Sequence, residues 1–229
     1  MDVVVRSLLE GARLAVGAVA IIDVFRAFTT AAVVLANGAS KIVMVTTSEE
    51  ALTLRGKGVG HVCMGEVRGF MPAGFDFGNS PFEVSRIDFG GKTIIQRTSA
   101  GTQGVVAAAG AEWLYAAALV TARATAQALA SAGVGKISLV AMGDNGIKRT
   151  DEDELCALHL RNLLEGRPGQ VEAVRQLIWA GGEIARFNDP ARLHLHPEDV
   201  DIALDVDRYA FAVRVRTEDG RPVARIDAR

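Results

Sequence analysis

Short apolar runs rich in β-branched residues alternate with segments of helical pattern along most of this 229-residue chain. The run LAVGAVAIID reads as a buried strand that ends at Asp23, and a helical segment follows it from Arg26. The strand KIVMV then leads into a second helix, which Thr47 and Glu50 open as a capping box. Such alternation is typical of helices packed on both faces of a parallel sheet, so we expect a layered α/β/α fold.

The last third of the chain has a different pattern. Residues 166–206 have helical character interrupted by prolines and glycines, and YAFAVRVRTEDGRPVARID after them alternates apolar and polar residues around a turn at Asp219 and Gly220. The sheet should therefore be mixed and largely parallel, with a C-terminal β-hairpin. Because no repeat and no Ser/Gly-rich linker interrupts the chain, we expect one domain over 1–229, with a helical insertion at about 166–206 before the final hairpin.

Charge and cysteine content argue against several classes of partner. The net charge of −2 gives no reason to expect nucleic acid or an anionic membrane. Cys63 and Cys156 lie far apart without CxxC spacing, which indicates neither a disulfide framework nor a zinc site. The apolar run at 14–22 is too short to span a bilayer and follows no basic signal-peptide region, so we expect a cytoplasmic protein. The exposed edge of the final hairpin would pair with a second copy to give a homodimer.

One glycine-rich stretch, GEVRGFMPAGFDFGNSPFE at 65–83, concentrates polar groups between two apolar strands. Both signs of charge and neutral hydrogen-bonding groups occur there, the mixture needed to bind an anion together with a metal. The candidate residues are Glu66, Arg68, Asp76, Asn79 and Ser80. Ser80, Pro81 and Glu83 also fit a helix start with Ser80 as N-cap. The two interpretations are compatible, because a helix N-terminus is itself an anion site.

Four polar loops follow predicted strands, and ligands of α/β folds bind beyond the carboxyl ends of parallel strands. The loops begin near Asp23, Glu66, Arg97 and Gly143. Phosphate fits them, because arginines pair with its oxygens and the turn after KTIIQ offers backbone N–H groups and hydroxyls. The candidate phosphate ligands are Arg26, Arg68, Arg97, Thr98, Ser99, Gly101, Thr102 and Gln103. The Walker and GxGxxG fingerprints are absent from the sequence, so nucleotide binding has no specific support.

Carboxylates in the same loops indicate a divalent metal. The candidates are Asp23, Glu66, Asp76, Glu152 and Asp153. Mg²⁺ takes one or two carboxylates and leaves its other positions to water or phosphate oxygens, so most of the five cannot be ligands. Asp153 has a structural alternative as the N3 residue of a capping box begun by Thr150.

Several ordered motifs between Asp23 and Ala157 resemble the 2-phosphosulfolactate phosphatase family of coenzyme M biosynthesis: IDVFRAFTTAAVVLANGA, GEVRGF, GFDFGNSPFE, TSAGTQG and the acidic pair at 152–153. The resemblance implies a Mg²⁺-dependent hydrolase of α/β type that removes phosphate from 2-phosphosulfolactate to leave 3-sulfolactate. The three anionic groups of such a substrate account for the arginines and a metal in one cleft. The chain departs from the family pattern at Phe28 and at Ser99–Thr102, where the loss of an Asn amide removes a possible polar contact. Because many bacteria that carry members of this family have no evident use for coenzyme M, another small 2-phospho carboxylic acid is an alternative substrate.

The mechanism we expect is direct attack of water on the phosphate ester, with arginines and Mg²⁺ neutralising the phosphoryl oxygens. Some of Asp23, Glu66 and Asp76 would bind the metal, and Asp153 would orient water or protonate the leaving oxygen. The arginines, Asn79, Ser80 and the Thr98–Gln103 turn would recognise phosphate or sulfonate. A covalent aspartyl-phosphate at Asp23 is an alternative, although DVFRA lacks the DxD spacing of aspartate-nucleophile phosphatases. A non-hydrolytic sensor of a phosphorylated metabolite would use the same cleft.

Overall fold

The computed structural model describes residues 1–227, which form one nine-stranded sheet in the order β1-β7-β2-β6-β8-β9-β3-β5-β4. The strands are β1 (Asp2–Ser7), β2 (Ala18–Ile22), β3 (Lys41–Val45), β4 (Val62–Gly65), β5 (Thr93–Arg97), β6 (Trp113–Ala117), β7 (Lys136–Ala141), β8 (Ala212–Glu218) and β9 (Arg221–Asp227). The helices are α1 (Leu8–Arg13), α2 (Ala27–Ala36), α3 (Ser48–Gly56), α4 (Pro81–Val84), α5 (Gly101–Ala107), η1 (Leu119–Thr121), α6 (Ala122–Ser131), α7 (Asp151–Leu164), α8 (Val171–Ala180), η2 (Glu183–Asn188) and α9 (Pro197–Ala203).

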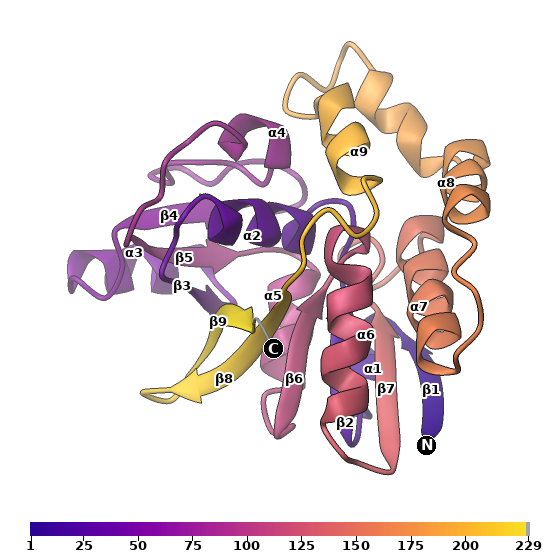
Figure 1. Ribbon diagram of the computed structural model, residues 1–229. Helices are drawn as coiled ribbons and strands as arrows, with labels where there is room; N and C mark the ends of the chain where they lie inside the picture. Colours follow the sequence, from indigo (N-terminus) through magenta and orange to yellow (C-terminus); the bar gives the residue numbers. More distant parts are fainter. Residues whose placement is uncertain (228–229) are drawn as a thin grey trace.

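The sheet consists of two parallel groups joined by an antiparallel hairpin. Strands β1, β7, β2 and β6 form one group, and β3, β5 and β4 form the other. The hairpin lies between them, with β8 antiparallel to β6 and β9 antiparallel to β3. Figure 1 shows the two groups turned relative to one another. The predicted α/β fold with a mixed, largely parallel sheet and a C-terminal hairpin is confirmed.

The position of the hairpin corrects one expectation. Both of its strands pair inside the sheet, and the edges of the sheet are β1 and β4. Residues of the hairpin pair with β6 on one side and with β3 on the other, so the hairpin is not an edge of the sheet. The expected exposed edge is therefore wrong, while a homodimer remains a prediction.

Strand β2 shows why helices cover both faces. All five of its residues are buried, and alternate side chains point to opposite faces. Val19 and Ile21 pack in a core with residues of α2 and α5, whereas Ile22 packs in a second core with residues of α6 and α7. A third core lies between α3 and the β3–β5–β4 group. Burial of each such side chain stabilises the fold by about 1.5–3 kcal/mol, and Ile21→Ala should cost about 2–5 kcal/mol.

Two predicted helix starts are confirmed. The Thr47 hydroxyl accepts a hydrogen bond from the Glu50 N–H at 3.1 Å, and the Ser80 hydroxyl accepts one from the Glu83 N–H at 3.2 Å, with proline at the first helical position. The strand β1 and the helix α1 were not predicted from the sequence. Both elements are short; β1 contains three consecutive valines and pairs with β7 at the edge of the sheet.

The predicted helical segment at 166–206 contains α8, η2 and α9. In Figure 1 it runs from the end of α7 across one end of the sheet before the chain returns to β8. The single-domain organisation remains a prediction. Within residues 1–227, none of the helices combines the length and the apolar composition that crossing a bilayer requires.

Candidate functional site

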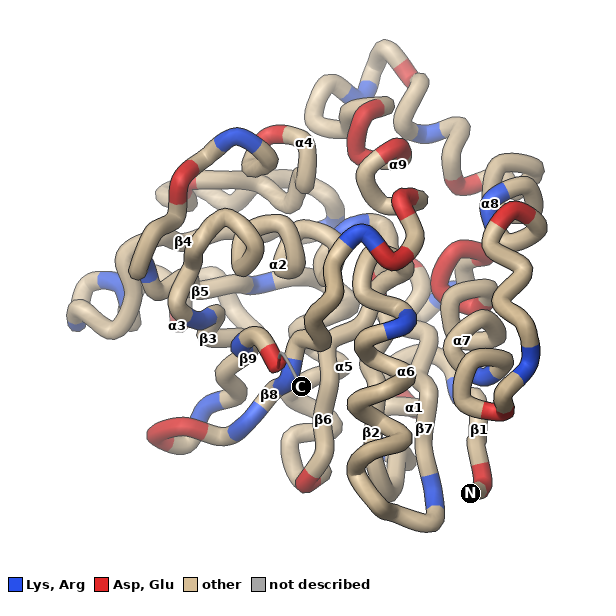
Figure 2. Tube along the Cα trace, viewed as in Figure 1, with Lys and Arg blue, Asp and Glu red and all other residues tan. Residues whose placement is uncertain are grey.

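A cavity of about 220 Å³ lies at the carboxyl ends of β2, β4, β5 and β7. The four strand-end loops that the sequence singled out converge there, as predicted, and the segment at 186–195 closes one side. The lining residues are Asp23, Phe25, Arg26, Glu66, Arg68, Gly69, Asn79, Ser99, Ala100, Gly143, Asp144, Asn145, Thr150, Glu152, Arg186, Arg192, His194 and Leu195. Figure 2 shows the first turn of α7 as an acidic stretch, and basic positions occur along the segment that follows. The cavity therefore combines carboxylates with arginines.

Asp23 is fixed by two backbone N–H groups on opposite sides of its carboxylate. Oδ1 accepts a hydrogen bond from the Ala27 N–H at 3.0 Å, and Oδ2 accepts one from the Gly101 N–H at 2.8 Å. A Cβ atom on residue 101 would lie 2.9 Å from Asp23 Oδ2, so the close approach requires glycine. Burial raises the pKa of Asp23 to about 6, against the two N–H groups and with the help of the Glu66 charge. The pKa of the Asp23 carboxyl thus lies well above that of an exposed aspartate.

Glu66 joins the loops that follow β4 and β5. Its Oε1 accepts from the Ser99 N–H at 2.5 Å, and Oε2 accepts from the Gly69 N–H at 2.6 Å and the Ser99 hydroxyl at 3.0 Å. Gly65, just before it, has φ +132°, and a Cβ atom there would lie 1.8 Å from the Arg97 carbonyl oxygen. The turn that aims Glu66 into the cavity therefore depends on glycine at 65.

Glu152 and Asp153 are neighbours on the first turn of α7 but have different surroundings. Asp153 accepts hydrogen bonds from the Val24 N–H at 2.7 Å and the Gly143 N–H at 2.8 Å, so it ties two strand-end loops together behind the cavity. Glu152 lines the cavity, and its Oε2 is buried without a hydrogen-bond partner among the described residues. Burial raises the pKa of Glu152 to about 7. Of the two carboxyl groups, that of Glu152 lines the cavity, whereas both oxygens of Asp153 accept hydrogen bonds from backbone N–H groups.

Asp76 and Ser80 lie outside the cavity lining. Oδ2 of Asp76 is 2.8 Å from Nη1 of Arg55 and accepts from the Cys63 N–H at 2.8 Å, in a half-exposed position beside α3. The structure does not bring Asp76 together with Asp23 and Glu66, as the expected metal set required. The Ser80 hydroxyl donates to Asp199 at 2.6 Å while it caps α4. In the structure, the contacts of these two residues are thus with other parts of the protein and not with the cavity.

Most residues of the predicted anion-binding turn hold the loops in place. Arg97 donates to the carbonyl oxygens of Thr46 and Glu66, and Gln103 donates to those of Thr46 and Thr98. The Thr98 and Thr102 hydroxyls bond within their own turn. Among the predicted substrate-binding residues, those that line the cavity are Arg26, Arg68, Asn79 and Ser99.

The helical segment contributes cavity residues that were not predicted from the sequence. Arg186, on η2, and Arg192 and His194, in the loop after it, line the cavity. Burial, helped by the charges of Arg26 and Arg192, lowers the pKa of His194. The centre of its ring lies 4.3 Å from the centre of the Phe70 ring. The local sequence offers no signal for these residues, because the pattern at 166–206 predicts helices and breaks but not their position over the sheet.

Oxygen acceptors in the cavity fit a hard cation. The Oδ1 of Asn79 and the Oε2 of Glu152 are buried without a hydrogen-bond partner in the described chain, and carboxylate oxygens of Asp23 and Glu66 keep a lone pair beyond the bonds they accept. Within residues 1–227, no three His, Cys, Asp or Glu side chains form a complete metal-binding group. A metal here would be held by one or two carboxylates and an amide, and completed by water or substrate oxygens, which is the coordination typical of Mg²⁺.

Comparison with known proteins gives a consistent family. The family model described as 2-phosphosulpholactate phosphatase matches residues 5–206. A "probable 2-phosphosulfolactate phosphatase" of Bacillus subtilis is 33% identical over 148 residues, which cover 64% of this chain and 63% of the relative. Relatives with the same name occur in Thermotoga petrophila, 41% identical over 55% of this chain and 53% of the relative, and in Carboxydothermus hydrogenoformans, 35% identical over 77% and 71%. The similarity thus spans between about half and somewhat over two thirds of the relatives' length.

Proposed function

This chain belongs to the 2-phosphosulfolactate phosphatase family, and from that membership we propose that it hydrolyses the phosphate monoester of 2-phosphosulfolactate to 3-sulfolactate and phosphate. The observation that supports this proposal most directly is the lining of the cavity. Four arginines, at 26, 68, 186 and 192, share it with the carboxylates of Asp23, Glu66 and Glu152. Arginines alone would suit anion binding, whereas the buried carboxylates among them suit proton transfer and metal binding.

The arginines suit a small substrate with several anionic groups. Guanidinium groups pair with the oxygens of phosphate, sulfonate or carboxylate through parallel N–H donors, and each charged hydrogen bond contributes about 1.5–3 kcal/mol. Arg68 and Arg192 have exposed side chains, and Arg186 is half-buried. Arg26 is 5% exposed and lies deepest. We assign phosphate to the buried end of the cavity near Arg26, and the other anionic groups to the arginines at its mouth.

Glu152 is the general acid of this proposal. In hydrolysis, the bond between phosphorus and the ester oxygen breaks and a bond from phosphorus to the water oxygen forms. Glu152 gives its proton to the leaving oxygen, and the proton released by the attacking water restores the protonated form of Glu152. With a pKa of about 7, Glu152 carries that proton through the acidic and near-neutral range and releases it readily. Asp153 contributes indirectly, by holding the loops after β2 and β7 in register.

We propose that Mg²⁺ is held by Asp23 and Glu66, with the amide oxygen of Asn79 completing the protein ligands. When bound, the ion would neutralise negative charge on the phosphoryl oxygens. The protein positions its carboxylates beforehand through backbone N–H groups of Ala27, Gly101 and Ser99, and the loss of such fixed geometry is costly in phosphoryl transfer.

Phosphate release from 2-phosphosulfolactate tests the proposal, measured beside 2-phospholactate, 2-phosphoglycolate and p-nitrophenyl phosphate, each with Mg²⁺ and with excess chelator. Metal-dependent release that prefers the sulfonate supports the full proposal. Metal-dependent release without that preference keeps the hydrolysis and replaces the substrate by another 2-phospho acid. Tight binding of these esters by calorimetry without release from any of them would show a sensor instead of an enzyme.

A further inference from the structure

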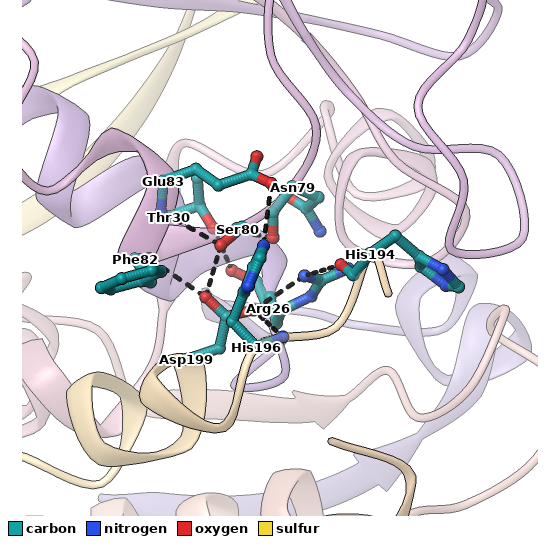
Figure 3. A network of polar contacts seen from close by, with 9 residues as sticks. All are labelled: Arg26, Thr30, Asn79, Ser80, Phe82, Glu83, His194, His196 and Asp199. Carbon is teal, nitrogen blue, oxygen red and sulfur yellow. Dashed lines mark hydrogen bonds and ion pairs between the residues drawn. The ribbon is translucent and has the colours of Figure 1, made fainter. Parts of the chain in front are cut away.

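Arg26 is held in place by the helical segment at 166–206 rather than by its own loop. Its Nη1 lies 2.8 Å from Oδ2 of Asp199 and donates to the carbonyl oxygen of His194 at 3.1 Å. The guanidinium carbon also lies 6.0 Å from the centre of the Phe187 ring. Figure 3 shows Asp199 and His194 beside the Arg26 side chain. In the described chain every side-chain hydrogen bond of Arg26 uses Nη1, which leaves the Nε and Nη2 donors for a ligand in the cavity.

Asp199 is completely buried and divides its two oxygens between two neighbours. Oδ1 accepts from the Ser80 hydroxyl at 2.6 Å and from the Phe82 N–H at 3.0 Å, which ties it to the start of α4. Oδ2 faces Arg26 and also lies 3.5 Å from the backbone nitrogen of His196, which precedes α9. The carboxylate thus joins three parts of the chain that are distant in sequence: the start of α2, the start of α4 and α9 (Figure 3).

The cost of burying this pair indicates what it does. Two charges that are 5% and 0% exposed lose most of their hydration, and a buried ion pair often stabilises a fold no better than apolar side chains of the same size. What the pair does provide is a fixed direction for the guanidinium plane and a local charge close to zero. An arginine held in this way presents directed N–H donors, so an anion binds it with less loss of side-chain freedom than it would a mobile arginine.

We propose that Asp199 is a positioning residue: it orients Arg26 toward the phosphate end of the cavity, so that the helical segment controls anion recognition deep in the strand-end site. The catalytic part of this inference rests on the proposed phosphatase function. The binding part does not, because it concerns only the affinity of the cavity for a phosphate anion.

Asp199→Asn separates the two sides of the carboxylate. An asparagine whose oxygen keeps the bonds to Ser80 and Phe82 turns its NH₂ group toward Arg26, where donor faces donor. The α4 contact survives and the Arg26 contact is lost. Glu198→Gln is the matched control, because Glu198 is the exposed neighbouring carboxylate on the same helix.

The experiment is a double-mutant cycle on Asp199→Asn and Arg26→Gln, with kcat and KM for 2-phosphosulfolactate, the Kd of inorganic phosphate by calorimetry in Mg²⁺, and Tm. We expect Asp199→Asn to lower kcat/KM on the order of 10²-fold and to weaken phosphate binding, and the double variant to lose no more than Arg26→Gln alone. Glu198→Gln should match the parent protein. A Tm loss with unchanged kcat/KM and phosphate Kd, or losses that multiply in the double variant, would overturn the inference.

Two further comparisons distinguish the test of Asp199 from the test of the proposed phosphatase function. If the parent protein binds phosphate but hydrolyses no ester, the phosphatase proposal fails while the phosphate Kd cycle still decides the role of Asp199. A parent protein that neither binds phosphate nor turns over would refute both. If Asp199→Asn does not fold, Asp199→Glu keeps the charge and shifts it by one methylene, and an unchanged phosphate Kd in that variant would refute positioning.

Discussion

The strand-end loops and the helical segment at 166–206 build the cavity in different ways. In the loops, the carboxylates of Asp23 and Glu66 each accept a hydrogen bond from a backbone N–H group of another loop, that of Gly101 and that of Ser99. The segment instead reaches the cavity through charged side chains, Arg186 and Arg192, and through the buried Asp199. Backbone-held groups keep their geometry when surface residues change, whereas side-chain contributions vary with single substitutions. We infer that the loops carry the chemistry and that the segment tunes anion recognition.

The largest loss of activity should come from Asp23→Asn, a substitution in the strand-end loops. One of the two N–H groups that now donate to the carboxylate would face an NH₂ group, and a buried negative charge at the proposed Mg²⁺ site would be lost. We expect kcat for phosphate release to fall on the order of 10³-fold, with little change in the far-UV circular dichroism spectrum.

Asp76→Asn is the matched control, since it makes the same chemical change at a carboxylate outside the cavity. It should remain close to fully active. If Asp76→Asn were inactive and Asp23→Asn active, the assignment of the chemistry to the cavity loops would be wrong.

Glu152→Gln should have the next largest effect, with kcat lower on the order of 10²-fold because the leaving oxygen loses its proton donor. The pH dependence of kcat should also have a definite direction. A general acid with a pKa of about 7 is protonated below that pH, so kcat of the parent protein should decline as the pH rises through about 7. The variant should lack that decline. If kcat declined with rising pH in the same way in the parent protein and in Glu152→Gln, the decline would come from the titration of another group.

The residues of the cavity differ in how well the sequence predicts them. Asp23 and Glu66 could be predicted because they follow buried strands, and the carboxyl ends of the strands meet in one place. Glu152 and Asp153 could not be told apart, since neighbours on a helix point about 100° from each other and the sequence does not give the rotation of α7. The direction of the Asp76 side chain depends on its pairing with Arg55, and the position of Arg186 depends on how the segment lies over the sheet. These are tertiary contacts without a local pattern.

Arg192→Ala tests the segment part of the comparison and should have a smaller effect. Its side chain is exposed, so water screens each contact with an anion and the loss should be about tenfold in KM, with kcat nearly unchanged. Arg161→Ala removes an exposed arginine from α7, outside the cavity lining, and controls for the general loss of positive charge. A fall in kcat at constant KM for Arg192→Ala would mean that the helical segment takes part in the chemical step. The assignment of the chemistry to the loops alone would then be wrong.

The smallest expected effect is on thermal stability. It distinguishes Glu152 at the cavity from an exposed carboxylate of the helical segment without measuring turnover. In the unfolded chain a glutamate loses its proton near pH 4.5, whereas burial holds the Glu152 proton to about pH 7 in the fold. Between these values the folded state binds more protons than the unfolded state, so its stability falls as the pH rises and the full cost is reached above pH 7. Glutamine carries no such charge.

In chelator, Tm of Glu152→Gln should therefore match the parent protein near pH 5 and exceed it by several degrees at pH 8, measured by thermal unfolding. Glu198→Gln, at an exposed carboxylate of the helical segment, should leave the pH dependence of Tm unchanged. Equal Tm values for Glu152→Gln and the parent protein at pH 8 would mean that the Glu152 charge is already compensated within the fold, and the reason for a proton on that group at neutral pH would disappear.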